Sequence, residues 1–271
     1  MSKAREYRCI VQSARWITPS VIELRVATLK PVRFEAGQFV SLEVPGLPEP
    51  GTWKPRTVKR LYSLASAPGA ADGKEFELCI KYQKGGLGSE FVKRLKAGDE
   101  FNMRAPFGDF VYDTDPSRSA CFIATGTGIA PMRSIVTSEH FQSQPPRKAL
   151  LLFGASDAGE ILYPGVFEQH GCEVVHALSR AGREPGPSTQ FKGRVTDYLK
   201  SLPAHWNWHG TDFYLCGNGE MIREVTRLLK EAHGVSPAAI RAEAFGPSGG
   251  ANSANNVVAL PQRATTKRAA A

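Results

Sequence analysis

The sequence has no apolar run near the length of a membrane span, and no two cysteines are spaced as CxxC. A span needs about twenty apolar residues, so we expect none here. The basic N-terminus is followed by no apolar core, which makes a secretory signal unexpected and a cytoplasmic location the default. We also expect no metal site, iron–sulfur cluster or disulfide, because the five cysteines are widely spaced: Cys9, Cys79, Cys121, Cys172 and Cys216.

Signatures of nucleic-acid binding are missing too, although the formal net charge is +8. The basic residues are dispersed, and no helix-turn-helix, zinc-finger or RNA-recognition motif is present. A nucleic-acid partner is therefore a competing interpretation that rests on charge alone. An acidic protein partner or a phosphate-bearing cofactor explains the charge equally well, and a solvated surface without a partner is the plain alternative.

The 271 residues leave room for two domains of ordinary size. Short runs of β-branched and aromatic residues predict an N-terminal antiparallel β-barrel of six strands with one short helix at Ser89–Leu95. Apolar strands alternate with helices after about residue 114, which predicts a C-terminal α/β domain with a parallel sheet. Gly, Ser, Asn and Ala dominate from Gly246, which is typical of a flexible tail. We therefore divide the chain into residues 1–113, 114–245 and 246–271.

Two motifs in the barrel region suggest a phosphate and ring-binding site. In Arg60-Leu61-Tyr62-Ser63, strand alternation places Arg60 and Tyr62 on one face, where a guanidinium can bind phosphate and a ring can stack. The second motif, Lys84-Gly85-Gly86-Leu87-Gly88-Ser89, precedes a helix whose N-terminus can bind an anion. Ser89 is predicted to be the N-cap or a phosphate ligand. Each motif alone is equally compatible with ordinary strand and turn structure.

Three further motifs stand at the ends of strands in the second half. Gly126-Thr127-Gly128-Ile129-Ala130-Pro131 follows a strand and fits a pyrophosphate cradle, although Pro131 replaces the third glycine of the usual dinucleotide fingerprint. Cys216-Gly217 and Met221 follow another strand, at the edge where ligands bind to open parallel sheets. Glu243-Ala244-Phe245 ends the last strand, where a carboxylate could transfer protons and a ring could cover a cofactor.

Together and in this order, the five motifs resemble the ferredoxin–NADP⁺ reductase superfamily over residues 5–245. The resemblance implies a barrel that binds FAD and an α/β domain that binds a nicotinamide dinucleotide. It implies that Arg60 binds the FAD pyrophosphate, that Tyr62 stacks on the isoalloxazine ring and that Ser63 lies near flavin N5. The expected cofactor contacts are Leu61, Ile80, Lys81, Tyr82, Gly86, Gly88, Ser89, Thr127, Gly128, Ser179, Arg180, Cys216, Gly217, Met221 and Phe245. Ser63, Cys216 and Glu243 are the expected catalytic residues.

The same resemblance implies an enzyme that oxidises NADPH and passes single electrons to an external acceptor, since the cysteines of a fused cluster are missing. An acidic ferredoxin or flavodoxin suits the basic chain. Ser179-Arg180 and Arg183 favour NADPH, with Tyr163 as a candidate to stack on adenine. NADH remains possible, because NADH-using oxygenase reductases also carry such a pair. The alternatives are therefore an NADH-dependent oxygenase reductase that uses a separate ferredoxin, and a non-catalytic flavoprotein subunit.

Phe245 matches the terminal aromatic residue that stacks on the flavin in plant-type members, but twenty-six residues follow it here. Either Phe245 keeps that stacking role and the tail leads away, or the tail covers the flavin. Because Ala251–Ala271 contains no aromatic residue, we do not expect stacking by the tail, which could instead contact the adenine end of FAD or an acceptor.

Overall fold

The computed structural model describes residues 4–48, 56–180 and 189–245, together with the main chain of residues 257–259. Six antiparallel strands form the N-terminal sheet in the order β4-β3-β6-β1-β2-β5. A bridge between Leu64 and Leu78 joins the two edge strands and closes the sheet into a barrel. The strands are β1 (Arg5–Thr18), β2 (Val21–Thr28), β3 (Phe39–Gly46), β4 (Arg56–Ser63), β5 (Glu75–Lys81) and β6 (Glu100–Phe107). The predicted six-stranded barrel is confirmed.

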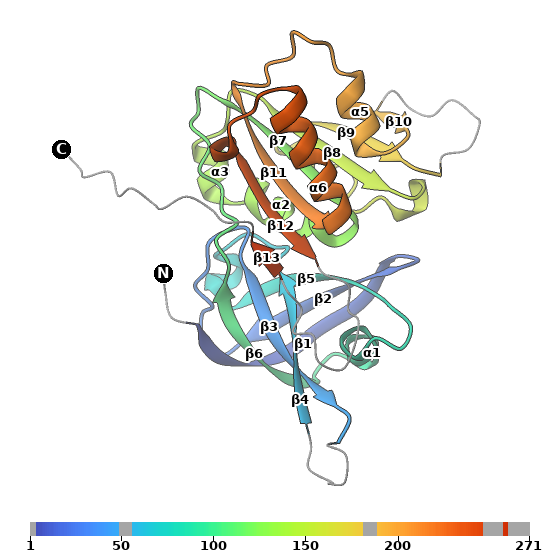
Figure 1. Ribbon diagram of the computed structural model, residues 1–271. Coiled ribbons are helices and arrows are strands. Elements are labelled where there is room, and N and C mark those ends of the chain that lie inside the picture. Colours follow the sequence, from blue (N-terminus) through green and yellow to red (C-terminus); the bar gives the residue numbers. More distant parts are fainter. Residues whose placement is uncertain (1–3, 49–55, 181–188, 246–256, 260–271) are drawn as a thin grey trace, which may run out of the picture.

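Alternating apolar residues fill this barrel, among them Leu24, Leu42 and Met103, all fully buried. The short turn η1 (Ala70–Gly73) precedes β5, and helix α1 (Leu87–Arg94) lies between β5 and β6. Figure 1 shows the barrel below and the second domain above it.

The second domain is an α/β layer structure with sheet order β10-β9-β8-β7-β11-β12-β13. Its first six strands are parallel, as predicted: β7 (Ser119–Thr125), β8 (Ala149–Ala155), β9 (Cys172–Leu178), β10 (Gln190–Lys192), β11 (Thr211–Asn218) and β12 (Ile240–Phe245). The helices are α2 (Ile129–Val136), α3 (Glu139–Ser143), α4 (Val166–Gln169), α5 (Val195–Ser201) and α6 (Gly219–Arg227). Short helical turns are η2 (Gly126–Gly128), η3 (Ala158–Glu160), η4 (Leu228–Ala232) and η5 (Pro237–Ala239).

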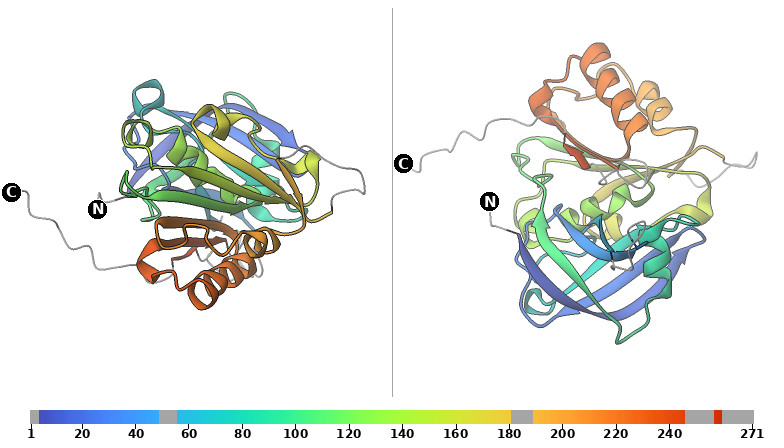
Figure 2. Two further views of the ribbon diagram at one scale, coloured as in Figure 1. Left: turned by 90° about the horizontal axis from the view of Figure 1, so that it is seen from above. Right: turned by 60° about the horizontal axis from the view of Figure 1, so that its bottom comes forward.

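Two apolar clusters cover the two faces of the parallel sheet. Figure 2 shows α5 and α6 on the outer face, and α2 between the sheet and the barrel. The outer cluster includes Leu199 and Val225, while the inner cluster includes Ile129 and Met132 of α2. The inner cluster also takes in Val21, Ala65 and Cys79 from the barrel. Apolar packing is therefore continuous from one domain into the other.

Helix α2 ends at Val136, and the Thr137 hydroxyl donates to the Arg133 carbonyl (2.7 Å). Ser138 then caps the separate helix α3 by accepting from the Phe141 amide (3.2 Å).

Within the predicted tail, the structure describes only β13 (Val257–Ala259). It pairs antiparallel with β12, and Ala259 lies opposite Glu243. β13 thus covers the edge of the strand that carries the predicted catalytic carboxylate, as Figure 1 shows at the junction of the domains.

All five cysteines are free and buried. Among the described helices, none is long and apolar enough to cross a membrane.

Candidate functional site

The predicted FAD cradle is built where β4 meets the start of α1. Gly88 is buried, and a Cβ atom on it would collide with the Tyr62 hydroxyl and lie 3.0 Å from Arg60 Cγ. Only a glycine therefore lets the helix backbone approach these two side chains. Arg60 and Tyr62 share this face of the strand, as their alternation predicts.

Helix α1 begins two residues earlier than expected, with Gly86 as its N-cap. Ser89 is therefore inside the first turn, and the prediction that it is the N-cap is wrong. Its buried hydroxyl donates to the Gln83 carbonyl (2.8 Å) and accepts from the Gln83 amide (3.0 Å). The hydroxyl holds the glycine loop in place, which leaves main-chain N–H groups of the first turn to face a phosphate. With Arg60 beside them, these groups fit the FAD pyrophosphate.

The other predicted barrel contacts differ in exposure. Ile80 is buried in the barrel core, so only its main chain can face a cofactor. Lys81 is exposed, and Leu61 is half-buried. Tyr82 donates to Glu90 Oε1 (2.7 Å) and packs edge-on against Trp16. The burial of Tyr62 raises the pKa of its phenol to about 12, despite the opposing charge of Arg60, so the phenol is neutral.

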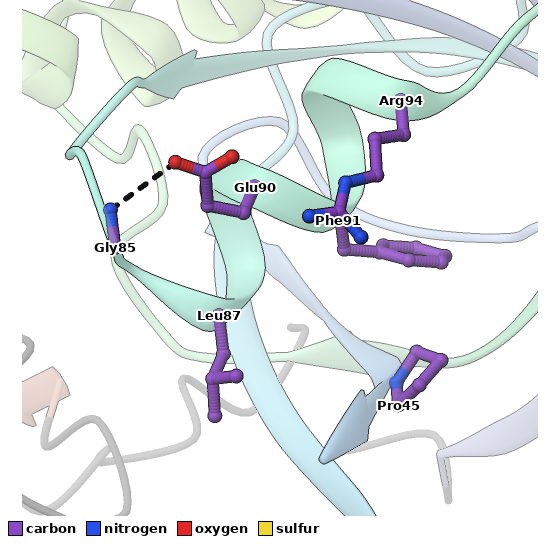
Figure 3. Close-up of a pocket in the computed structure, with 6 residues that line it drawn as sticks. All are labelled: Pro45, Gly85, Leu87, Glu90, Phe91 and Arg94. Atoms are coloured by element: carbon purple, nitrogen blue, oxygen red, sulfur yellow. Dashed lines mark hydrogen bonds between the residues drawn. The ribbon is translucent and has the colours of Figure 1, made fainter. Parts of the chain in front are cut away.

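A shallow pocket of about 270 Å³ borders this cradle on the outer side of α1 (Figure 3). Glu90 spans its rim and accepts a hydrogen bond from the Gly85 amide (3.1 Å), which ties the glycine loop to the helix. Pro45, Leu87, Phe91 and Arg94 line the rest. None of the predicted cofactor contacts lines this pocket.

The second cradle lies at the carboxyl ends of β7 and β11. A Cβ atom on Gly128 would overlap the Cys216 carbonyl group and come within 2.7 Å of Gly217 Cα. Gly217 has a φ of +129°, and a Cβ there would collide with Thr125. The Asn218 amide also donates to Thr125 Oγ1 (3.0 Å). The GTG turn, which includes Thr127, is thus pressed onto the next strand end, a shape that suits a dinucleotide backbone.

The two domains meet at the end of β4. Ser63 Oγ donates across the boundary to Glu243 Oε1, at a long distance of 3.4 Å, and both residues are buried. Cys216 is fully buried and lies beside Glu243 in the parallel pairing of β11 with β12. The structure therefore brings together all three predicted catalytic residues.

The electrostatics of this junction favour protonated groups. Burial raises the pKa of Glu243 to about 8, the Ser63 hydrogen bond lowers it, and the charge of Asp109 raises it further. The carboxyl group is therefore largely protonated at neutral pH. Burial, together with Glu243, raises the pKa of Cys216 well above its ordinary value, so this residue is a thiol.

Sequence reasoning missed two residues near the Ser63–Glu243 contact. A Cβ atom on Gly108 would lie 2.8 Å from the Phe39 ring and 3.6 Å from Glu243 Oε2. Phe39 pairs with Ser63 across β3 and β4 and stacks on Phe107. No motif marks Phe39 or Gly108, because their place depends on strand register.

Phe245 is half-buried at the end of β12 and packs against the inner apolar cluster. Met221, in the first turn of α6, is 8% exposed and belongs to the outer cluster. Their predicted contacts with the flavin and the nicotinamide remain predictions.

The expected NADPH-selecting residues lie at the same edge of the sheet. Ser179 and Arg180 follow β9 and are exposed, and the Arg180 amide donates to the Ser156 carbonyl (2.7 Å). Arg183 lies outside the described residues. The Arg133 guanidinium lies 4.4 Å from the Tyr163 ring centroid and covers one face of the ring, and the Tyr163 hydroxyl is buried. The expected stacking of Tyr163 on adenine stays a prediction.

Comparisons with known proteins agree with this arrangement. The family model of the oxidoreductase FAD-binding domain matches residues 8–112, and that of the oxidoreductase NAD-binding domain matches residues 122–227. Ferredoxin–NADP reductase B of Sorangium cellulosum is 30% identical over 253 residues, which cover 90% of this chain and 100% of that protein. The chain belongs to the ferredoxin–NADP reductase family.

Other members of the ferredoxin–NADP reductase family are longer. The reductase component of phenol 2-monooxygenase from a Pseudomonas species is 31% identical over 83% of this chain, which covers only 62% of that protein. The crystal structure of an Amycolatopsis cytochrome P450 reductase superposes with a TM-score of 0.77 at 26% identity, covering 92% of this chain and 72% of that one.

As a member of the ferredoxin–NADP reductase family, the chain is an oxidoreductase that binds FAD and a nicotinamide dinucleotide and passes on electrons from NAD(P)H. The glycines that fit against Tyr62 and Cys216 agree with these two ligands.

Proposed function

We propose that this chain oxidises NADPH with the aid of FAD and passes electrons singly to a separate protein such as ferredoxin or flavodoxin. FAD, when bound, supplies the redox chemistry: it accepts hydride and releases electrons. The observation that carries the proposal is the contact of Ser63 with Glu243, because it joins the end of the FAD cradle to the strand edge that carries Cys216.

The chain's own contribution is to bind, orient and control a proton. Arg60 and the first turn of α1 hold the pyrophosphate, and Tyr62 supports the ring system. Gly128 and Gly217 would hold the dinucleotide backbone at the strand end that carries Cys216. The Ser63 hydroxyl donates to Glu243 Oε1, and the burial of both residues keeps water from the reacting atoms.

One relative that this chain covers over its whole length is a ferredoxin–NADP reductase, which supports a ferredoxin-like acceptor. The net charge of +8 supports attraction of an acidic partner. The division at residues 113 and 114, with a tail from 246, is part of the same proposal.

NADPH is proposed as the donor because Arg180 can bind a 2′-phosphate. One neighbouring group favours the alternative, an NADH-dependent reductase that serves an oxygenase. The Ser156 hydroxyl, next to Arg180, donates to Asp157 (2.9 Å), and this exposed carboxylate would repel a 2′-phosphate. A monooxygenase reductase component is also among the relatives.

Steady-state assays would test the proposal. FAD-loaded protein is mixed with NADPH or NADH and with an oxidised ferredoxin or flavodoxin, and acceptor reduction is followed by absorbance. We expect a higher kcat/KM with NADPH and a rate that falls as salt screens the acidic acceptor. A higher kcat/KM with NADH would favour the oxygenase alternative, and reduction of neither acceptor would refute the proposed electron transfer.

A further inference from the structure

Helix α2 connects the dinucleotide cradle to the barrel. The helix starts directly after Gly128, and near its middle Arg133 reaches into the other domain. Arg133 Nη1 donates to Glu77 Oε2 (2.5 Å) and to the Ala65 carbonyl (3.1 Å). Ser134 Oγ, on the next residue, donates to the Ser66 carbonyl (2.7 Å).

These contacts fall on the part of the barrel that matters most for the reaction. Ala65 and Ser66 follow Ser63 by two and three residues along the chain. Ala65 is itself fully buried in the apolar cluster that contains α2. Helix α2, which follows the dinucleotide cradle, is therefore hydrogen-bonded to the segment that directly follows Ser63 at the end of the FAD cradle.

The Arg133 guanidinium is largely buried and contacts Glu77, Ala65 and the Tyr163 ring. Its side chain is 19% exposed, and its guanidinium covers the Tyr163 ring at 4.4 Å. Arg25 holds the other oxygen of Glu77 through Nη2 (2.7 Å). Burial alone would raise the pKa of Glu77, but the two arginines outweigh it and hold the pKa below its ordinary value. The Arg133–Glu77 pair is the buried part of this network, and its charged hydrogen bonds restrict how α2 can lie on the barrel.

We propose that Arg133 is a positioning residue for hydride transfer: it fixes the dinucleotide cradle relative to Ser63. This role rests on the proposed function. Hydride transfer needs the reacting atoms at about 3–3.5 Å, and a displacement of about 1 Å can cost roughly 100-fold in rate. Loss of the guanidinium frees α2 from Ala65 and Glu77, so the nicotinamide stacks in less well-aligned positions.

The test compares R133Q and R133K with a matched control, R118Q. Arg118 also binds a carboxylate (Asp212 Oδ1, 3.0 Å) and a main-chain carbonyl (Thr211, 3.1 Å). Its contacts stay within the α/β domain, at the amino ends of β7 and β11, whereas the dinucleotide cradle lies at their carboxyl ends.

Two rates are measured anaerobically on FAD-loaded protein, each per bound flavin. The first is the bleaching of the flavin by saturating NADPH, which requires aligned domains. The second is the reoxidation of dithionite-reduced protein by ferricyanide, which needs no nicotinamide. We expect R133Q to slow bleaching about tenfold or more, R133K to restore part of the loss, and reoxidation to stay unchanged. R118Q should keep both rates.

Equal bleaching per flavin in R133Q and wild type would overturn the role, even if the variant melts earlier or retains less FAD. If R133Q does not fold, the same two rates are measured on R133K and S134A. Each of these substitutions weakens the contact of α2 with the barrel while keeping neighbouring bonds, so bleaching equal to that of wild type would overturn the role. Wild-type protein that bleaches with neither NADPH nor NADH would refute the proposed function itself, and this role with it.

Discussion

Replacing Glu243 with glutamine should change how the stability of the protein depends on pH. The carboxyl group is 3% exposed, and burial raises its pKa from an ordinary 4.5 to about 8. Between these values the folded protein keeps a proton that the unfolded chain has released. The stability that Glu243 contributes is therefore fully present below pH 4.5 and is lost as the pH rises through about 8.

The size of the effect follows from the two pKa values. Each pH unit in this interval lowers the unfolding free energy by about 1.4 kcal/mol, and the whole interval amounts to about 5 kcal/mol as an order of magnitude. Glutamine keeps the shape and the contact with Ser63 but does not titrate. The unfolding free energy of wild type relative to E243Q should therefore fall with rising pH.

Urea unfolding of both proteins with excess FAD, at pH values from about 5 to about 8, would measure this difference, because both proteins gain the same stabilisation from the ligand. The other titrating groups cancel in the comparison. If the two stability curves run parallel across this range, the carboxyl group does not keep its proton on folding and the description of the junction is wrong.

Four further substitutions test the two cradles and the proposed 2′-phosphate contact of Arg180. Y62A should weaken FAD binding by about tenfold or more through loss of ring contact, whereas Y62F should retain it; the flavin-to-protein absorbance ratio after gel filtration reports this. G128A should retain FAD but lose NADPH binding, because its methyl group overlaps the Cys216 carbonyl. An equilibrium titration in which G128A binds NADPH as tightly as wild type would show that the cradle is wrongly placed. R180A should raise the KM for NADPH about tenfold and leave that for NADH unchanged, and equal effects on both would show that Arg180 does not contact the 2′-phosphate.

The sequence predicts the two domains and the strands that carry the site, because alternation and glycine spacing are local signals. The face shared by Arg60 and Tyr62 and the approach of Gly88 follow from such signals. The N-cap role predicted for Ser89 is wrong, because a hydroxyl that binds the Gln83 main chain looks the same in sequence as one that caps a helix. Its contact with phosphate stays a prediction.

Contacts between the domains could not be predicted. Arg133 and Glu77 are 56 residues apart and belong to different domains, so their pairing depends on how the domains dock. Arg133 also covers one face of the Tyr163 ring, 30 residues further along the same domain, which the sequence pattern does not indicate either. Likewise, composition predicts only flexibility for the tail, whereas the edge of β12 offers Val257–Ala259 a partner strand.

In the proposed function, one molecule holds a flavin and a nicotinamide face to face at the Ser63–Glu243 junction. The most direct test mixes FAD-loaded protein anaerobically with NADPH and follows the visible flavin absorbance, with a second sample in which the transferred hydrogen is deuterium. We predict that the flavin bleaches and that deuterium slows the bleaching. A protein that takes up no FAD, or whose flavin stays oxidised with both NADPH and NADH, would contradict the claim.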